Sequence, residues 1–205
     1  KDRPLLVELS QALFEAGFST LRFSFSGNGS SEGKFEESTI SKEVKEVGSI
    51  VDSFPSKKII YVGHSMGGAV GVLSTLEFER IECLVTLAGM MQPRAFYERE
   101  FSAYVPDESY IWDEKEFPLS TSLKEDLCEV VESLVSRVDA FDKPWLLVHG
   151  TEDDLVLHEE GEAMKAKLGE AVKFASIEGG DHSFNDEQRE ETIGVVVDWL
   201  IEQIS

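Results

Sequence analysis

Short apolar runs that alternate with helix-forming stretches constrain the fold of this chain more than any other feature. The runs lie at residues 18–25, 57–63, 81–89, 144–150 and 172–179. They are almost continuously apolar, as strands are when helices bury both faces of a parallel sheet. Because strands that alternate with helices form βαβ units, the pattern predicts an α/β fold with a mainly parallel sheet and helices on both of its faces.

The stretches between the runs carry apolar residues at helical spacing. These positions are Leu6, Leu9, Leu13 and Phe14 near the start of the chain, Ile40, Val44, Val47 and Val51 in the next stretch, and Ile193, Val196, Val197, Leu200, Ile201 and Ile204 at the end. Residues 66–77 also have a helical composition. We therefore expect a helix in each of these places.

The chain length of 205 residues suits a single domain, residues 1–205, with one insertion. Residues 90–142 separate two predicted strands by more than one crossover needs. The insertion is rich in aromatic and charged residues, and its end carries apolar residues at helical spacing from Ser122 to Val138 (Leu123, Leu127, Val130, Leu134 and Val138). Because long insertions in compact domains usually have a function, we expect a short lid.

The segment from Gly63 to Gly67 matches the pattern G-x-S-x-G between a predicted strand and a predicted helix. A sharp turn there strains the central residue Ser65, and side chains in place of the two glycines would clash. The turn lifts the hydroxyl above the strand ends, and the helix N-terminus points toward it. A plain glycine turn is the alternative, but the strand–turn–helix setting favours a nucleophile.

A serine hydroxyl needs a base to take its proton. Two polar loops follow later strands: the first holds Glu152, Asp153 and Asp154, and the second holds Asp181 and His182. Both loops lie at the carboxyl ends of their strands, where ligands of open α/β sheets bind. The chain order of serine, acid and histidine predicts His182 as the base and an aspartate of the first loop as the acid.

The remaining histidines and acidic residues have simpler interpretations. We expect Glu152 to be solvated, and Asp181 is too close in sequence to reach around to His182. His149 at a strand end is interpreted as a packing or loop-orienting residue, and His158 as a surface residue.

Together these motifs resemble the α/β-hydrolase superfamily, in particular serine esterases and lipases. "GHSMGG" resembles the nucleophile elbow, "GGDHSF" the histidine loop, and "HGTEDDLV" the acid loop HG-x-x-D-x-x-V, which selects Asp153 over Asp154. "LRFSFSGNGSSEGKF" resembles the family's strand and loop before the elbow, with Ser24 where an aspartate is frequent. Within the superfamily the chain looks most like bacterial cinnamoyl/feruloyl esterases and acylglycerol lipases.

The resemblance implies hydrolysis of carboxylic esters through an acyl-enzyme intermediate. Ser65 would attack the ester, His182 would move the proton, Asp153 would orient the imidazole, and the Met66 backbone N–H would stabilise the oxyanion. The family takes a second oxyanion donor from a loop before its first helix. We expect that loop and the N-terminal strands to lie upstream of Lys1.

Other chemistries and one other protein class share these features. Thioester hydrolysis, acyl transfer and other hydrolyses use the same triad, and a non-catalytic binding protein on the same fold is a further alternative. The expected partner is a small-molecule ester. Candidate substrate contacts are His64, although the elbow is expected to point it away from Ser65, together with Phe96, Tyr97, Tyr104, Trp112 and Phe184. Packing within the lid is the alternative for its aromatic residues.

Composition excludes several classes of function. The net charge of −21, from 40 acidic and 19 basic residues, argues against binding to nucleic acid or to anionic membranes. No apolar run approaches the roughly 18 residues of a membrane span, and the first residues do not resemble a signal peptide. Cys83 and Cys128 provide no disulfide framework, and no Cys/His spacing suggests a metal. We expect a cytoplasmic protein without metal or cofactor.

Overall fold

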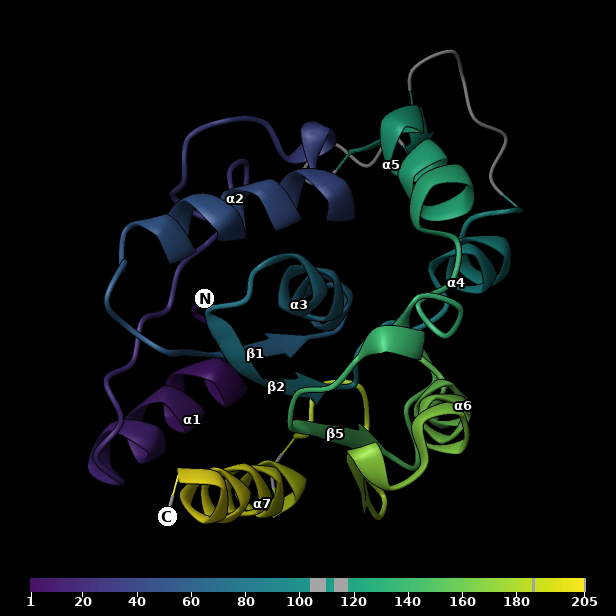
Figure 1. Cartoon of the computed structure of the whole chain (residues 1–205). Coiled ribbons are helices and arrows are strands. Elements are labelled where there is room, and N and C mark those ends of the chain that lie inside the picture. Colours follow the sequence, from purple (N-terminus) through teal and green to yellow (C-terminus); the bar gives the residue numbers. More distant parts are fainter. Residues whose placement is uncertain (104–109, 113–117, 186, 205) are drawn as a thin grey trace.

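The computed structural model describes residues 1–103, 110–112, 118–185 and 187–204 (Figure 1). Its centre is a parallel sheet in the order β1-β2-β5-β6. The strands are β1 (Ile59–His64), β2 (Ile81–Leu87), β5 (Trp145–Gly150) and β6 (Val172–Ile177). Because all four run in the same direction, their carboxyl ends meet at one edge, as the sequence predicts.

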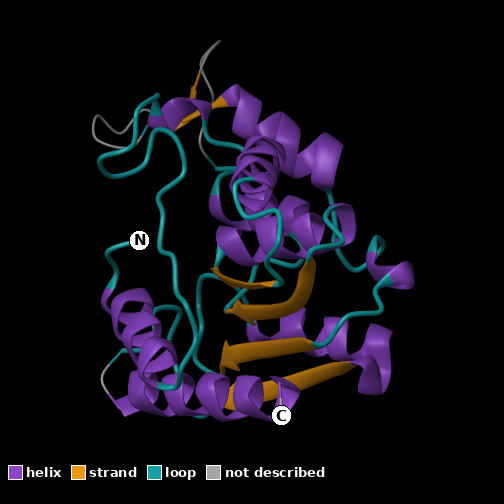
Figure 2. Cartoon of the chain, turned by 60° about the vertical axis from the view of Figure 1, so that its left-hand side comes forward, coloured by secondary structure: helices purple, strands orange, loops and turns teal. Residues whose placement is uncertain are grey.

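Helices cover both faces of this sheet (Figures 1 and 2). One face packs against α2 (Ile40–Asp52), α3 (Met66–Glu77) and α6 (His158–Leu168), and the other against α1 (Pro4–Glu15) and α7 (Glu187–Ile204). Successive strand residues alternate between the two layers: Leu84 and Leu147 join the first core, whereas Val85 and Leu146 join the second. Near-continuous apolar strands therefore follow from burial on both faces.

The predicted strand at residues 18–25 is wrong. This segment has no strand conformation, and no strand of the described residues pairs with it. Phe23 and Phe25 pack against the α2/α3 core with their rings edge to face at 5.0 Å, whereas Leu21 is exposed. The apolar pattern thus reports partial burial, but a strand also needs a neighbour that completes its backbone hydrogen bonds.

The insertion between β2 and β5 contains α4 (Pro93–Glu100), β3 (Tyr110–Trp112), β4 (Leu119–Ser120) and α5 (Thr121–Glu125). The predicted helix over residues 122–138 ends early: α5 continues as a π-helical segment (Asp126–Val131) and stops at Glu132, whose φ is +57°. Leu134 and Val138 are still buried, outside this helix, but Val130 is exposed. Tertiary packing, rather than a continued helix, therefore buries Leu134 and Val138, the last apolar residues at this spacing.

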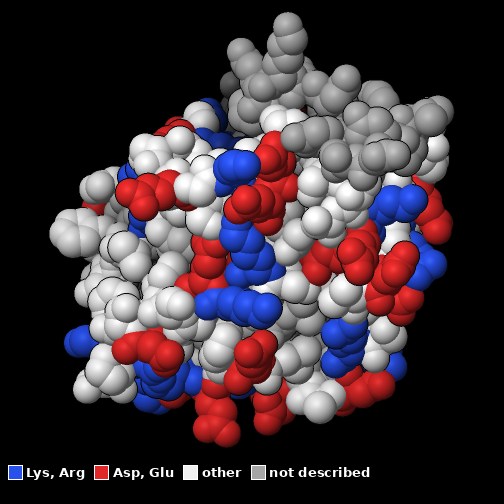
Figure 3. Space-filling model, turned by 90° about the horizontal axis from the view of Figure 1, so that it is seen from above, with Lys and Arg blue, Asp and Glu red and all other residues white. Residues whose placement is uncertain are grey.

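On one face of the molecule, the acidic excess is mixed with basic residues. Figure 3 shows acidic and basic side chains interspersed over the face that it draws. Among the described residues, no helix combines the length and the apolarity that crossing a membrane requires.

The approach of α3 to the end of β2 depends on glycine. A Cβ on Gly68 would lie 2.7 Å from the Cα of Gly89, which is backbone and cannot rotate away. We expect Gly68→Ala to destabilise the protein by about 1–3 kcal/mol. Gly194 in α7 is the matched control, because a Cβ there meets nothing within 4 Å, and Gly194→Ala should stabilise the helix by about 0.5–1 kcal/mol. Urea denaturation measures both; equal effects would contradict this packing.

Glu43 is a buried acid on the inner side of α2. Burial raises its pKa from 4.5 to about 8, the negative charges of Glu46 and Asp126 act in the same direction, and Lys42 opposes them. The folded protein therefore holds this proton more tightly than the unfolded chain does. The resulting stabilisation is complete below about pH 4.5 and is lost as the pH rises through about 8.

Glu43→Gln should remove this pH dependence, because the amide is neutral at every pH. We expect the variant and the wild type to have similar free energies of unfolding near pH 4.5, and the advantage of the variant to grow as the pH rises to about 8 and then to level off. Denaturation at a series of pH values measures the difference. Stability curves that stay parallel over this range would show that Glu43 does not titrate as a buried acid.

Candidate active site

Ser65 occupies a sharp turn between β1 and α3. Its φ of +57° and ψ of −125° are strained for a residue with a side chain. Backbone hydrogen bonds hold the strained residue on both sides: its N–H donates to Leu87 O at 3.0 Å, and its carbonyl accepts from Gly68 N and Met90 N. Met66 is the first residue of α3, so its N–H has no partner within the helix and lies next to the nucleophile position.

The two glycines of the pattern have different structural roles. A Cβ on Gly63 would lie 2.1 Å from the backbone oxygen of Gly67, so this position requires glycine. A Cβ on Gly67 would meet nothing within 4 Å. The expectation of a clash on both sides of Ser65 is therefore correct for Gly63 and wrong for Gly67, since the helix opens into free space at that point.

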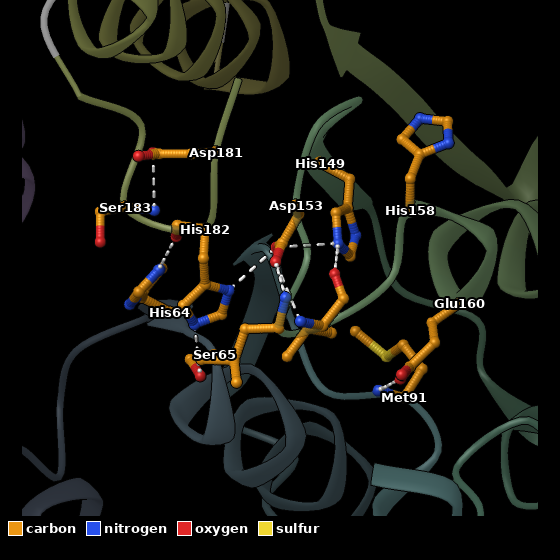
Figure 4. A network of polar contacts seen from close by, with 12 residues as sticks. His64, Ser65, Met91, His149, Asp153, His158, Glu160, Asp181, His182 and Ser183 are labelled. Carbon is orange, nitrogen blue, oxygen red and sulfur yellow. Dashed lines mark hydrogen bonds and ion pairs between the residues drawn. The ribbon is translucent and has the colours of Figure 1, made fainter. Parts of the chain in front are cut away.

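Three loops bring the predicted triad residues together (Figure 4). The Oγ of Ser65 lies 2.9 Å from Nε2 of His182, and Nδ1 of His182 lies 2.9 Å from Oδ2 of Asp153. The imidazole is thus placed to accept the serine proton on one side and to donate to the carboxylate on the other. Residues far apart in the sequence form one continuous hydrogen-bonded chain.

The other acidic residues of these loops do not contact His182. Glu152 and Asp154 are exposed, whereas the side chain of Asp153 is fully buried. Asp181 instead accepts hydrogen bonds from Ser183 and Asn185 within its own loop. The acid loop therefore presents a single carboxylate to the histidine.

Hydrogen bonds keep the buried Asp153 ionised. Burial alone would raise the pKa of its carboxyl, but hydrogen bonds from His149, His182 and Val156 outweigh this effect and hold the pKa well below its usual range. A permanently charged carboxylate can orient the imidazole of His182 and stabilise its protonated form.

A second close approach of backbones joins the acid and histidine loops. A Cβ on Gly150 would lie 2.1 Å from the carbonyl oxygen of Gly180. Around it, Glu152 N donates to Gly180 O at 2.9 Å and Thr151 N donates to Ile177 O at 3.0 Å. These contacts are not among the predictions from the sequence, although a glycine that ends one strand and a Gly-Gly pair after the next are the signals of such an approach.

Two buried polar residues outside the predicted triad also join the site. His149 lies in β5 beside Asp153, with its Nε2 3.3 Å from Oδ2 of Asp153. Glu160 in α6 accepts hydrogen bonds from Met91 N and Gln92 N, both at 2.9 Å, and so ties α6 to the start of the insertion. Nothing in the sequence pattern distinguishes Glu160 from the other acidic residues of its helix.

The candidate substrate contacts have different surroundings. His64 donates to the carbonyl of His182 at 2.7 Å, and burial lowers its pKa to about 4, so a neutral imidazole supports the histidine loop. Phe96 is half-buried, whereas Tyr97 and Phe184 are 6% and 0% exposed and pack within the two cores. Tyr104 and the side chain of Trp112 lie outside the described residues.

Within the part of the chain that the structure describes, no group of three or more His, Cys, Asp or Glu side chains could hold a metal ion.

The different roles of the elbow glycines give a testable prediction. Gly63→Ala should destabilise the fold by about 1–3 kcal/mol, because the new methyl group meets the backbone of the turn. Gly67→Ala is its matched control two residues beyond Ser65, and it should leave stability unchanged or slightly raised. Thermal and urea denaturation measure both. A Gly63→Ala protein as stable as the wild type would contradict the close approach.

Residues 3–195 match the sequence model of the alpha/beta hydrolase family. The human mitochondrial palmitoyl-protein thioesterase ABHD10 is 27% identical over 206 residues, which cover 92% of this chain and 65% of that protein. The chain thus spans slightly less than two thirds of the length of such curated relatives.

Solved structures show the same architecture. Est1E from Butyrivibrio proteoclasticus with bound ferulic acid has a TM-score of 0.84 at 26% identity, over 99% of this chain and 84% of that chain. A monoacylglycerol lipase from Paleococcus ferrophilus shares the fold, with a TM-score of 0.77 at 21% identity over 95% of this chain and 88% of that chain. Both the match along the sequence and the arrangement of the sheet lead to one conclusion: the chain belongs to the alpha/beta hydrolase family.

Proposed function

We propose that the protein is a serine hydrolase that cleaves carboxylic esters through an acyl-enzyme intermediate. The observation that carries this proposal is the hydrogen-bonded chain from Ser65 through His182 to Asp153, with both links at 2.9 Å. Such a chain supplies a nucleophile, a base within reach of its proton, and a charged group that orients the base.

In the acylation step, Ser65 Oγ attacks the ester carbonyl while Nε2 of His182 takes the hydroxyl proton. His182 then returns this proton to the leaving alcohol as the C–O bond breaks. Asp153 keeps Nδ1 protonated, so that Nε2 is free to act as a base. Water attacks the acyl-enzyme by the same route, and the acid product leaves Ser65 free.

The negative charge that develops on the carbonyl oxygen needs N–H donors. The Met66 N–H at the start of α3 is the first candidate, and the dipole of that helix acts in the same direction. Losing one such donor typically costs on the order of 100- to 1,000-fold in rate. The second donor remains a prediction.

The insertion over residues 90–142 is the proposed lid, and a small-molecule ester is the proposed substrate. Of the two lid aromatics with described side chains, Phe96 is half-buried at the edge of a core, whereas Tyr97 lies inside it. Ferulic acid bound to Est1E is consistent with an aromatic acyl group, since that protein is 26% identical and shares the fold.

A thioester substrate is the second candidate, because the curated relative at 27% identity is a palmitoyl-protein thioesterase. The same triad would cleave either bond, since the acyl carbonyl that Ser65 attacks is common to both. The leaving group distinguishes them, as an alcohol requires the proton from His182 more than a thiol does.

The test uses a fluorophosphonate probe and p-nitrophenyl esters of increasing acyl length, with matched S-acyl substrates. We expect wild type to be labelled and to turn over esters, and Ser65→Ala to lose both, with kcat falling by at least about 1,000-fold. Ser49→Ala, an exposed serine on α2, is the matched control and should behave as wild type.

Two outcomes would change the proposal. If wild type is neither labelled nor faster than Ser65→Ala on any substrate, hydrolysis by Ser65 is wrong and a binding role on this fold is favoured. A kcat/KM for the S-acyl substrate far above that for the O-acyl substrate of the same length would favour the thioesterase.

A further inference from the structure

His149 is a buried, ionisable side chain that the steps above do not use. It lies in β5, four residues before Asp153, and none of its surface is exposed. Its Nε2 atom lies 2.7 Å from the carbonyl oxygen of Val156 and 3.3 Å from Oδ2 of Asp153 (Figure 4). One ring nitrogen therefore faces two oxygen atoms of the acid loop.

These contacts define where the ring carries its proton. A carbonyl oxygen only accepts hydrogen bonds, so Nε2 of His149 must donate to Val156. The other nitrogen, Nδ1, is buried and has no hydrogen-bond partner among the described residues. The geometry thus selects the Nε2–H tautomer, and the same N–H lies within reach of Asp153.

The carboxylate of Asp153 is consequently fixed at both oxygens. Oδ1 accepts the N–H groups of Leu155 at 3.0 Å and Val156 at 2.9 Å. Oδ2 lies between two imidazoles, with His182 Nδ1 at 2.9 Å and His149 Nε2 at 3.3 Å. A hydrogen-bond donor from His149 at Oδ2 therefore weakens the electrostatic interaction of that oxygen with His182.

We propose that His149 is a positioning residue that acts through Asp153: its N–H shares Oδ2 with Nδ1 of His182 and thereby sets the lower pH limit of the triad. Without the His149 N–H, Oδ2 would keep more negative charge toward His182 and would stabilise the protonated imidazole. Protonated His182 cannot accept the serine proton, so activity would begin at a higher pH. The activity part of this inference rests on the proposed hydrolase function.

Other charged and titratable groups surround the pair. His64 faces His182 with ring centroids 4.8 Å apart, and Arg3 acts electrostatically on His64. On the other side, His158 packs against His149 with ring centroids 5.8 Å apart, and Glu160 interacts electrostatically with both His149 and Arg99. None of these side chains is altered in the His149 variants, so a comparison of those variants isolates the His149 N–H, with its contacts to Val156 and Asp153.

Three variants separate the N–H donor from simple packing. His149→Gln keeps an N–H near the position of Nε2, whereas the shorter His149→Asn does not reach Asp153. His158→Gln is the matched control, because that histidine packs against His149 but donates nothing to Asp153. Circular dichroism and thermal denaturation show whether each variant is folded.

The measurements are pH–activity profiles and nitrogen NMR of the histidine rings. In wild type we expect the Nε2–H tautomer at His149. In His149→Asn the acid limb of activity and the NMR titration of the His182 ring should both move up by about 0.5–1 pH unit. In His149→Asn, kcat should also fall roughly 10-fold while KM changes by less than about twofold. His149→Gln should return both midpoints close to wild type, and His158→Gln should not move them.

Each outcome supports or overturns the proposal. An Nδ1–H tautomer in wild type, or a folded His149→Asn protein with unchanged midpoints, would overturn it. If His149→Asn does not fold, two measurements still test the proposal. An Nε2–H tautomer in wild type together with His149→Gln midpoints close to wild type supports it, whereas an Nδ1–H tautomer or shifted His149→Gln midpoints overturn it. If the protein hydrolyses no substrate, the proposed function fails separately, because the NMR titrations require no catalysis.

Discussion

Parallel pairing of β1, β2, β5 and β6 is the constraint on which the rest of the site depends. It places the loops after β1, β5 and β6 at one edge of the sheet, and those loops hold the nucleophile, the acid and the histidine. The sheet alone leaves the loops free to diverge. The contact between the Gly150 and Gly180 backbones removes that freedom, because side chains at these positions would separate the acid loop from the histidine loop.

Backbone hydrogen bonds from the neighbouring strand then stabilise the strained nucleophile turn. Non-glycine residues in such conformations cost about 1–3 kcal/mol, and they persist where surrounding structure compensates. Ser65 bonds to Leu87 and Met90, while Ala88 donates to Val148 O on the next strand. Met91 and Gln92 continue the connection to Glu160 in α6. The elbow, the start of the insertion and α6 therefore form one bonded unit beside the triad.

Local signals in the sequence predicted most of the architecture and the central part of the site. Apolar runs predicted β1, β2, β5 and β6, and helical spacing predicted α1, α2 and α7, because both patterns report burial directly, whereas composition predicted α3. The same patterns predicted the wrong secondary structure where apolar residues are buried without forming a strand or a helix. Residues 18–25 are partly buried without a pairing partner, and beyond residue 131 the apolar residues of the insertion stay buried after the left-handed Glu132 ends the helix.

By itself, the sequence determined the fold class, the strained position of Ser65 and the chain order of nucleophile, acid and base, because these depend on local residue pattern. Only the tertiary structure decided which atoms meet. It placed Oδ2 of Asp153 between two imidazoles, brought Glu160 to the backbone of Met91, and placed Tyr97 and Phe184 in core packing. Such contacts join residues distant in the sequence, and their geometry follows from how layers pack rather than from any local pattern.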